Sequence, residues 1–171
     1  MADPAYSKKE IRRAVNLSAF LGWLAITFPF LWLALGASGF AGMLAYLFYA
    51  SIFGLPLAFA LCWLVGRPIL GFAMKAPVSW GKAVLWGAVI STTIAGITIA
   101  IGRYRGWRQS LDDRFYSRLG GGDNVQSIDG ILTLYGWQVL AQNTALFVAL
   151  GVAIALIVRW HIGPGHSKLE R

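Results

Sequence analysis

Long uncharged blocks separated by clusters of basic residues are the main pattern of this chain. Charged side chains are absent from residues 14–66, 83–102 and 130–158. A membrane-spanning helix needs about 20 predominantly apolar residues. None of these blocks alternates polar and apolar residues as the strands of a membrane barrel do, so the pattern predicts helices.

The first block is too long for one span, and its only interruption is a run of small residues, Gly36 to Gly39. We therefore expect two helices joined there by a tight turn, and four transmembrane helices in all. Their predicted positions are about 15–35, 40–65, 83–102 and 137–158. The expected fold is an all-α integral membrane four-helix bundle that forms a single domain over residues 1–171.

Composition supports the membrane assignment. The chain is 57% hydrophobic and 13% charged, whereas soluble domains have roughly 25% charged residues. Its net charge of +8 comes from basic residues at the ends of the apolar blocks. This distribution favours anionic lipid headgroups on the cytoplasmic side over nucleic acid as the partner.

The basic residues also predict the orientation, because cytoplasmic flanks are enriched in Lys and Arg. The N-terminal tail, the segment from Arg67 to Lys82 and the C-terminal tail each carry basic side chains with few acids. Both termini are therefore expected in the cytoplasm, as in a bacterial inner-membrane protein. Arg103, Arg105 and Arg108, at the outer end of the third helix, run against this rule. Cleavage of the first helix as a signal peptide is the alternative, and it would leave three spans.

The outer loop, residues 103–136, is expected to contain a short amphipathic helix. Ser110 is a candidate N-cap and Gly120 a natural stop, so the predicted helix covers 111–119. Its surface is a candidate docking site for a partner, and the alternative is a lid that covers the end of the bundle. The candidate interaction residues are Trp107, Arg108, Leu111, Asp112, Arg114 and Phe115.

Small residues at four-residue spacing predict where helices pack, because they let backbones approach closely in lipid. The third helix carries Gly87, Ser91 and Ala95 in one row. The fourth carries Ala141, Ala145 and Ala149. We expect the two rows to pack together, and a homodimer or partner interface is the alternative.

Three amides lie near the outer end of the fourth helix: Gln138, Gln142 and Asn143. Gln138 and Gln142 are one turn apart and share a face. They are candidates for lining a polar pathway, or for hydrogen bonds between helices.

Residue types that are absent from the predicted spans and loops argue against several classes of function. No ionisable side chain lies well inside a predicted span, which argues against a proton-coupled pump. The two histidines, His161 and His166, both lie in the C-terminal tail and make a poor metal site. Cys62 is the single cysteine. No catalytic set can be assembled, so we expect no cofactor, no metal and no enzymatic activity, with a lipid-modifying enzyme as the least favoured reading.

The sequence thus predicts a multi-pass membrane protein that acts as an accessory or assembly subunit by binding another membrane protein or itself. The alternative is a small-solute channel or permease subunit that acts as an oligomer.

Overall fold

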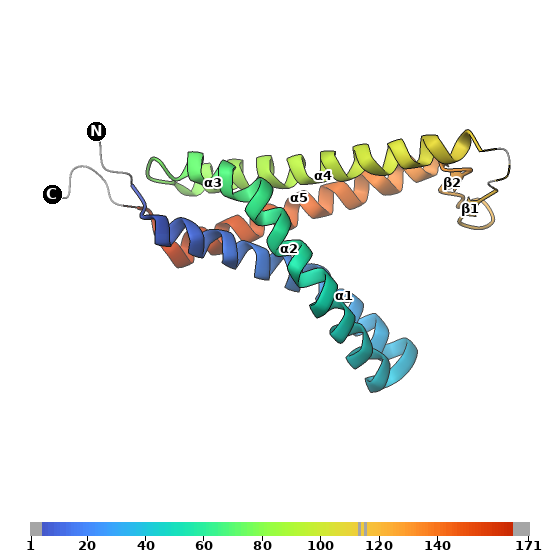
Figure 1. The fold of residues 1–171 in the computed structure, drawn as a ribbon, viewed down its shortest axis with the longest axis horizontal. Coiled ribbons are helices and arrows are strands. Elements are labelled where there is room, and N and C mark those ends of the chain that lie inside the picture. Colours follow the sequence, from blue (N-terminus) through green and yellow to red (C-terminus); the bar gives the residue numbers. More distant parts are fainter. Residues whose placement is uncertain (1–4, 113, 115, 166–171) are drawn as a thin grey trace. The chain divides into compact units, whose positions relative to one another are not determined.

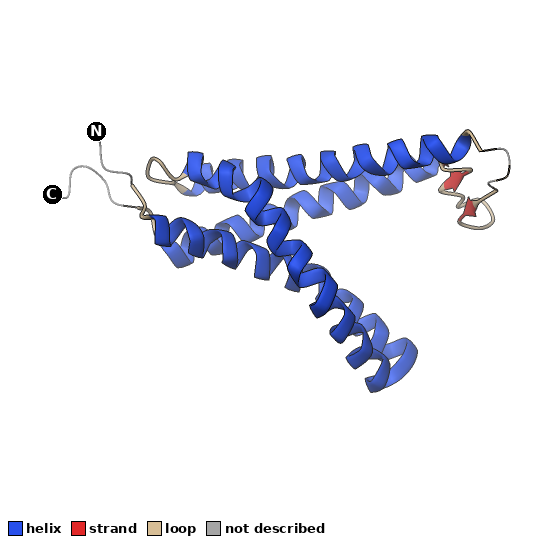
Figure 2. Cartoon of the chain, viewed as in Figure 1, coloured by secondary structure: helices blue, strands red, loops and turns tan. Residues whose placement is uncertain are grey.

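The computed structural model describes residues 5–112, 114 and 116–165. The fold is all-α in character, and three helical runs are long and apolar enough to cross a membrane (Figures 1 and 2). The helices are α1 (Lys8–Tyr49), α2 (Leu55–Leu61), α3 (Arg67–Ala73), α4 (Trp80–Ser110) and α5 (Leu134–Ile162). The strands are β1 (Arg118–Leu119), β2 (Ser127–Ile128) and β3 (Ile131–Leu132). Residues up to Ile90 together with those from Leu150 form one compact unit, and Ser91–Ala149 forms another.

The first helical run doubles back at Gly39. The run Lys8–Ala73 has 66 residues, which at roughly 1.5 Å per residue would extend about 100 Å as one rod. Gly39 has φ 66° and ψ −166°, outside the helical region and suited to glycine. In Figure 1 the ribbon reverses in its cyan segment.

Three contacts connect the two arms of this hairpin. Trp63 donates from Nε1 to Asn16 Oδ1 at 3.1 Å, and Trp23 donates from Nε1 to the Ala50 carbonyl at 2.9 Å. Nearer the turn, the rings of Phe30 and Tyr46 lie 6.0 Å apart. The residue numbers in the pairs converge on Gly39, as they must in two antiparallel helices.

Two π-helical turns allow the second arm to pass two prolines. The turns η1 (Ala50–Gly54) and η2 (Cys62–Gly66) precede Pro56 and Pro68. Proline has no N–H to donate and its ring crowds the preceding carbonyls, and a π turn relieves this locally. The helical run therefore continues through α3 to Ala73, beyond the end near residue 65 that the sequence predicted.

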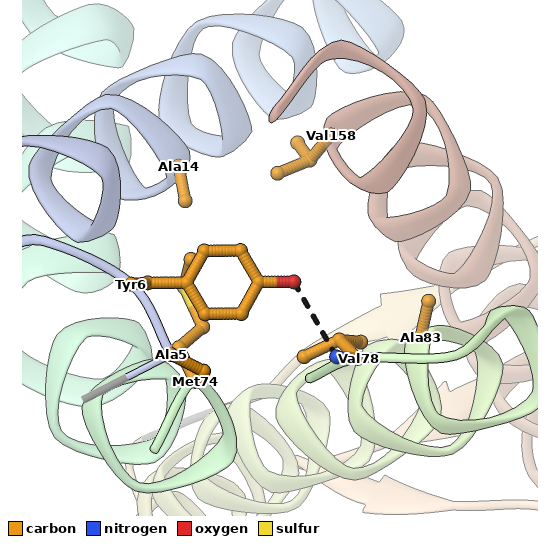
Figure 3. Close-up of a cluster of buried hydrophobic side chains, with 7 residues drawn as sticks. All are labelled: Ala5, Tyr6, Ala14, Met74, Val78, Ala83 and Val158. Atoms are coloured by element: carbon orange, nitrogen blue, oxygen red, sulfur yellow. Dashed lines mark hydrogen bonds between the residues drawn. The ribbon is translucent and has the colours of Figure 1, made fainter. Parts of the chain in front are cut away.

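The main buried cluster lies where the segment before α1, the connection after α3 and the C-terminal end of α5 converge (Figure 3). Its members are Ala5, Tyr6, Ala14, Met74, Val78, Ala83 and Val158. Tyr6 is only 2% exposed. Its hydroxyl donates to the Gly163 carbonyl at 3.1 Å and accepts from the Val78 N–H at 3.4 Å.

Further hydrogen bonds tie the α3–α4 connection to the end of α5. Val78 N–H also donates to the Pro164 carbonyl at 3.2 Å, and the Arg159 guanidinium donates from Nε to the Val78 carbonyl. The same guanidinium lies 5.2 Å from the centre of the Trp80 ring. The start of α4 and the end of α5 therefore lie together, so these two helices are antiparallel.

The amphipathic helix expected over 111–119 is absent from the residues that are described there. α4 instead continues to Ser110, and β1 occupies Arg118–Leu119. The Ser110 hydroxyl donates back to the Trp107 carbonyl at 2.7 Å, so this serine closes α4 and does not cap a new helix. Asp113 and Phe115 lie outside the described residues.

Candidate interaction site

The segment between α4 and α5 folds into a small antiparallel sheet with the order β1-β2-β3. Asp129 and Gly130 form the two-residue turn between β2 and β3, with φ of 49° and 81°. Asp-Gly suits such a turn because both positions need positive φ. This hairpin was not predicted, although Asp-Gly between Ile128 and Ile131 is a typical hairpin signal.

Asp129 also holds the start of the sheet. Its carboxylate accepts from the Ser117 N–H at 3.0 Å, and its own N–H donates to the Ser117 carbonyl at 2.8 Å. Asp129 therefore stabilises the fold of this segment through both its carboxylate and its backbone.

Two glycines fix the sheet to the last turns of α4. Gly106 and Gly130 approach so closely that a Cβ on either one would collide with the backbone of the other. The Arg103 guanidinium adds a hydrogen bond of 3.4 Å to the Gly130 carbonyl. The Arg103 guanidinium therefore has a hydrogen-bond partner within the segment.

Thr133 connects the sheet to α5. Its N–H donates to the Gln126 carbonyl at 3.0 Å, and its hydroxyl accepts from the Gly136 N–H at 3.0 Å, which caps the helix. α5 thus starts at Leu134, three residues before the expected start, and the segment between α4 and α5 is anchored at both ends.

The anchored segment exposes aromatic and apolar side chains. Tyr104 and Trp107 lie on the exposed side of α4 with ring centres 6.0 Å apart. Leu111 and Tyr116 follow and are also exposed. Trp107 and Leu111 were predicted as interaction residues, and both are accessible to a partner.

The same segment exposes unpaired arginines. Arg105, Arg108, Arg114 and Arg118 are exposed, and no ion pair joins them to another described residue. The Asp112 carboxylate accepts from the Arg114 N–H at 3.0 Å, which forms a local turn. The surface of this segment is therefore cationic and aromatic, a combination that suits an anionic partner surface.

The predicted packing row on α4 is buried at each of its positions. Gly87 and Ser91 are buried, and Ala95 is buried as well. A Cβ on Gly87 would lie 2.7 Å from Ala155 Cβ and 3.0 Å from the Gly151 carbonyl oxygen. The backbones of α4 and α5 thus approach closely at Gly87.

The predicted row on α5 lies elsewhere. Ala141, Ala145 and Ala149 are exposed, and the α5 residues that meet Gly87 are Gly151, Val152 and Ala155 instead. The sequence could not separate these alternatives, because small residues occur on both sides of α5.

The three predicted pathway amides are also exposed. Gln138, Gln142 and Asn143 make no side-chain hydrogen bond to any other described residue. The neighbouring Thr144 hydroxyl, in contrast, donates to the Leu140 carbonyl at 2.7 Å. The amides therefore keep their hydrogen-bonding capacity for a partner outside the described chain.

Metal ligands do not cluster in the part of the chain that is described, where no group of three or more His, Cys, Asp or Glu side chains converges. Cys62 is a free thiol, and His166 lies outside the described residues. Comparison with protein-family models, with curated proteins and with solved structures finds no match to this chain.

Proposed function

We propose that the chain crosses the membrane four times, with both termini in the cytoplasm. The convergence of Tyr6, Val78 and Gly163 supports an even number of crossings, because it brings both chain ends and the α3–α4 connection to one side. The reversal at Gly39 supports two crossings within the run Lys8–Ala73.

Charge supports the orientation. The basic residues at the Tyr6 end of the helices are Lys8, Lys9, Arg12, Arg13, Arg67, Lys75, Lys82 and Arg159. Glu10 is the acidic residue among them, and it is engaged in the Ser7 capping box. An excess of basic residues of this kind is typical of a cytoplasmic face, and a bacterial-type inner membrane is the proposed location.

On this topology the protein acts as a non-enzymatic accessory or assembly subunit, which binds a partner membrane protein through the outer segment. One observation carries this proposal: the segment between α4 and α5 is locked by the Gly106–Gly130 contact and presents unpaired arginines beside Trp107. A rigid surface loses little conformational entropy on binding. The partner surface that fits is acidic and contains apolar patches.

Affinity purification of the tagged protein from its native membrane in mild detergent tests this function. The informative variant replaces Arg108→Ser, Asp112→Asn and Arg114→Ser together. The matched control removes the same number of charges at the other end, with Lys9→Ser, Glu10→Gln and Arg13→Ser. Loss of a stoichiometric partner in the first variant alone supports the proposal, and a partner retained equally by both refutes it.

A small-solute channel or permease subunit is the second candidate. The exposed and unpartnered amides of Gln138, Gln142 and Asn143 favour it, because such groups can line a polar pathway in an oligomer. Solute flux through purified protein in liposomes, lost on Gln142→Leu, would support this function over partner binding.

A further inference from the structure

One face of α5 carries a regular row of amides and alanines. Gln138, Gln142, Ala145 and Ala149 follow one another at spacings of four, three and four residues. At about 100° per residue they fall within about 60° of one another around the helix. All four are exposed, and the row lies away from Gly151 and Ala155, which pack near Gly87.

On the proposed topology, two exposed tryptophans indicate how deep this row lies in the bilayer. Trp137 and Trp160 stand near opposite ends of α5, about 35 Å apart along the helix axis. Tryptophans of this kind mark the two interfaces of a bilayer. Gln142 is then about 7.5 Å inside the outer interface, where lipid cannot hydrogen-bond to it.

An amide in that position requires a polar partner. A carboxamide has two N–H donors and an acceptor oxygen, and leaving them unsatisfied in hydrocarbon is costly. The described residues supply no partner for Gln138 or Gln142. The alanines beside them add no bulk that would keep another helix away.

We propose that this face of α5 pairs with the same face of a second copy of the chain. The inference rests on the proposed membrane topology. All copies then share one orientation, so a two-fold axis along the membrane normal brings each Gln142 to the depth of its counterpart. Two facing amides are complementary because each is both donor and acceptor.

The spacing of the row also fits such a pair. Alternating steps of four and three residues form the seam of two helices that cross at about 20°. Val152 and Leu156 continue the same spacing toward the cytoplasmic end, but Val152 meets Gly87 of α4 and Leu156 packs against the Tyr6 cluster within the same chain. The seam is therefore confined to 138–149, with amides at its outer end and alanines toward its centre.

Disulfide cross-linking in native membranes tests the seam, and the chain offers a clean background because Cys62 is its single cysteine. In Cys62→Ser protein, Ala149→Cys is compared with Leu150→Cys. Leu150 is also exposed, at 42%, and lies at nearly the same depth but about 100° around the helix. We expect oxidation to produce a covalent dimer from Ala149→Cys and at least fivefold less from Leu150→Cys.

Gln142→Leu gives a second readout. Interhelical hydrogen bonds in membranes are modest, so we expect the dimer dissociation constant in bilayers to rise about three- to tenfold. Leu150→Ala, about 80° around the helix from Gln142 and off the seam, should leave it unchanged. Equal effects of the two variants would overturn the proposed face.

The possible outcomes distinguish failure of the proposed dimer from failure of the proposed membrane topology. If a water-soluble maleimide labels Ala149→Cys readily in intact membranes, α5 is not embedded and the proposed topology fails. If the cysteine is shielded but cross-links to no second copy, or only to a different protein, the topology stands and the two-fold seam is wrong.

Discussion

Hydrophobic side chains are buried in one region of the first compact unit and exposed in another. Around Tyr6, which is 2% exposed, a small cluster is closed on all sides. In the hairpin about Gly39, Trp32 is 73% exposed and Phe53 is 68% exposed. Hydrophobic side chains occur in both regions, so hydrophobicity alone does not determine burial here.

The surrounding medium explains the difference. The Tyr6 cluster lies at helix ends, where backbone groups of the connecting segments need partners and where Tyr6, Val78 and Gly163 supply them to one another. The two arms of the hairpin are helical, so their backbone is satisfied internally and their side chains can face lipid. The main buried cluster thus lies at helix ends, where the connecting segments need partners.

The largest expected effect comes from truncating a side chain in each region. Tyr6→Ala should lower the free energy of unfolding by about 3–5 kcal/mol, as for other buried aromatic residues. Phe53 is an aromatic side chain of similar size at an exposed position. Phe53→Ala should lower the free energy of unfolding far less, because lipid chains can fill the space that the ring leaves. Denaturant titration in mixed micelles or bicelles measures both, and equal losses would remove the distinction between the regions.

A charge in the hairpin should reveal that its exposed surface is not in water. Phe53→Arg places a guanidinium near the middle of the second arm, at an expected insertion cost of about 2.5–3.5 kcal/mol. On a water-exposed surface the same change would cost within about 0.5 kcal/mol. A glycosylation-tag assay of membrane insertion measures the cost, and Phe53→Leu is the control. Unimpaired insertion of Phe53→Arg would contradict a lipid-facing hairpin.

The Tyr6 hydroxyl should contribute separately from its ring. Tyr6→Phe leaves the Val78 N–H and the Gly163 carbonyl without this partner, at an expected cost of about 1–3 kcal/mol. Limited proteolysis should then release the N-terminal segment faster than in the parent protein. Unchanged proteolysis would mean that packing alone holds the segment.

Alkaline pH should weaken the Tyr6 cluster. Burial raises the pKa of Tyr6 above 10.0, partly opposed by the Val78 N–H and Arg159, while Glu10 adds to the increase. Because the folded pKa exceeds the unfolded one, its contribution is complete below about pH 10 and is lost as pH rises through the folded pKa. Tyr6→Phe should remove this part of the pH dependence of unfolding, and an unchanged profile would exclude Tyr6 as its source.

The smallest expected effect concerns the contact between the two arms of the hairpin. Trp23→Phe removes the hydrogen bond to the Ala50 carbonyl and should cost about 0.5–1.5 kcal/mol. Trp32→Phe, an exposed change of the same kind, is the control. Equal stability of the two variants would show that the hydrogen bond from Trp23 does not help to hold the arms together.

The sequence predicted the helical architecture well because uncharged blocks of about 20 residues leave few alternatives in a membrane. The reversal near Gly39 was also predicted, since the uncharged block 14–66 is too long for one span and is interrupted only by Gly36 to Gly39. The helix ends were less accurate. Arg67 and Arg103 suggested earlier ends, whereas the first run continues through two π turns to Ala73 and α4 continues to Ser110.

The candidate site was predicted only in part, for physical reasons. Amphipathic spacing suggested a helix at 111–119, but the Asp129-Gly130 turn and the Gly106 contact organise the segment as a sheet. Such a contact joins residues far apart in sequence, which periodicity does not detect. The row of alanines on α5 shows a related difficulty, because small residues predict close approach without saying which helix approaches.

Thiol labelling on the two sides of the membrane tests the central claim that the first helical run is a hairpin spanning the bilayer. In Cys62→Ser protein, Ser38→Cys beside the turn should react with a membrane-impermeant maleimide on intact spheroplasts. Lys9→Cys, at the Tyr6 end, should react only after permeabilisation. If both cysteines become reactive together, from either side, the run Lys8–Ala73 does not carry the Gly39 turn across the membrane and the account is wrong.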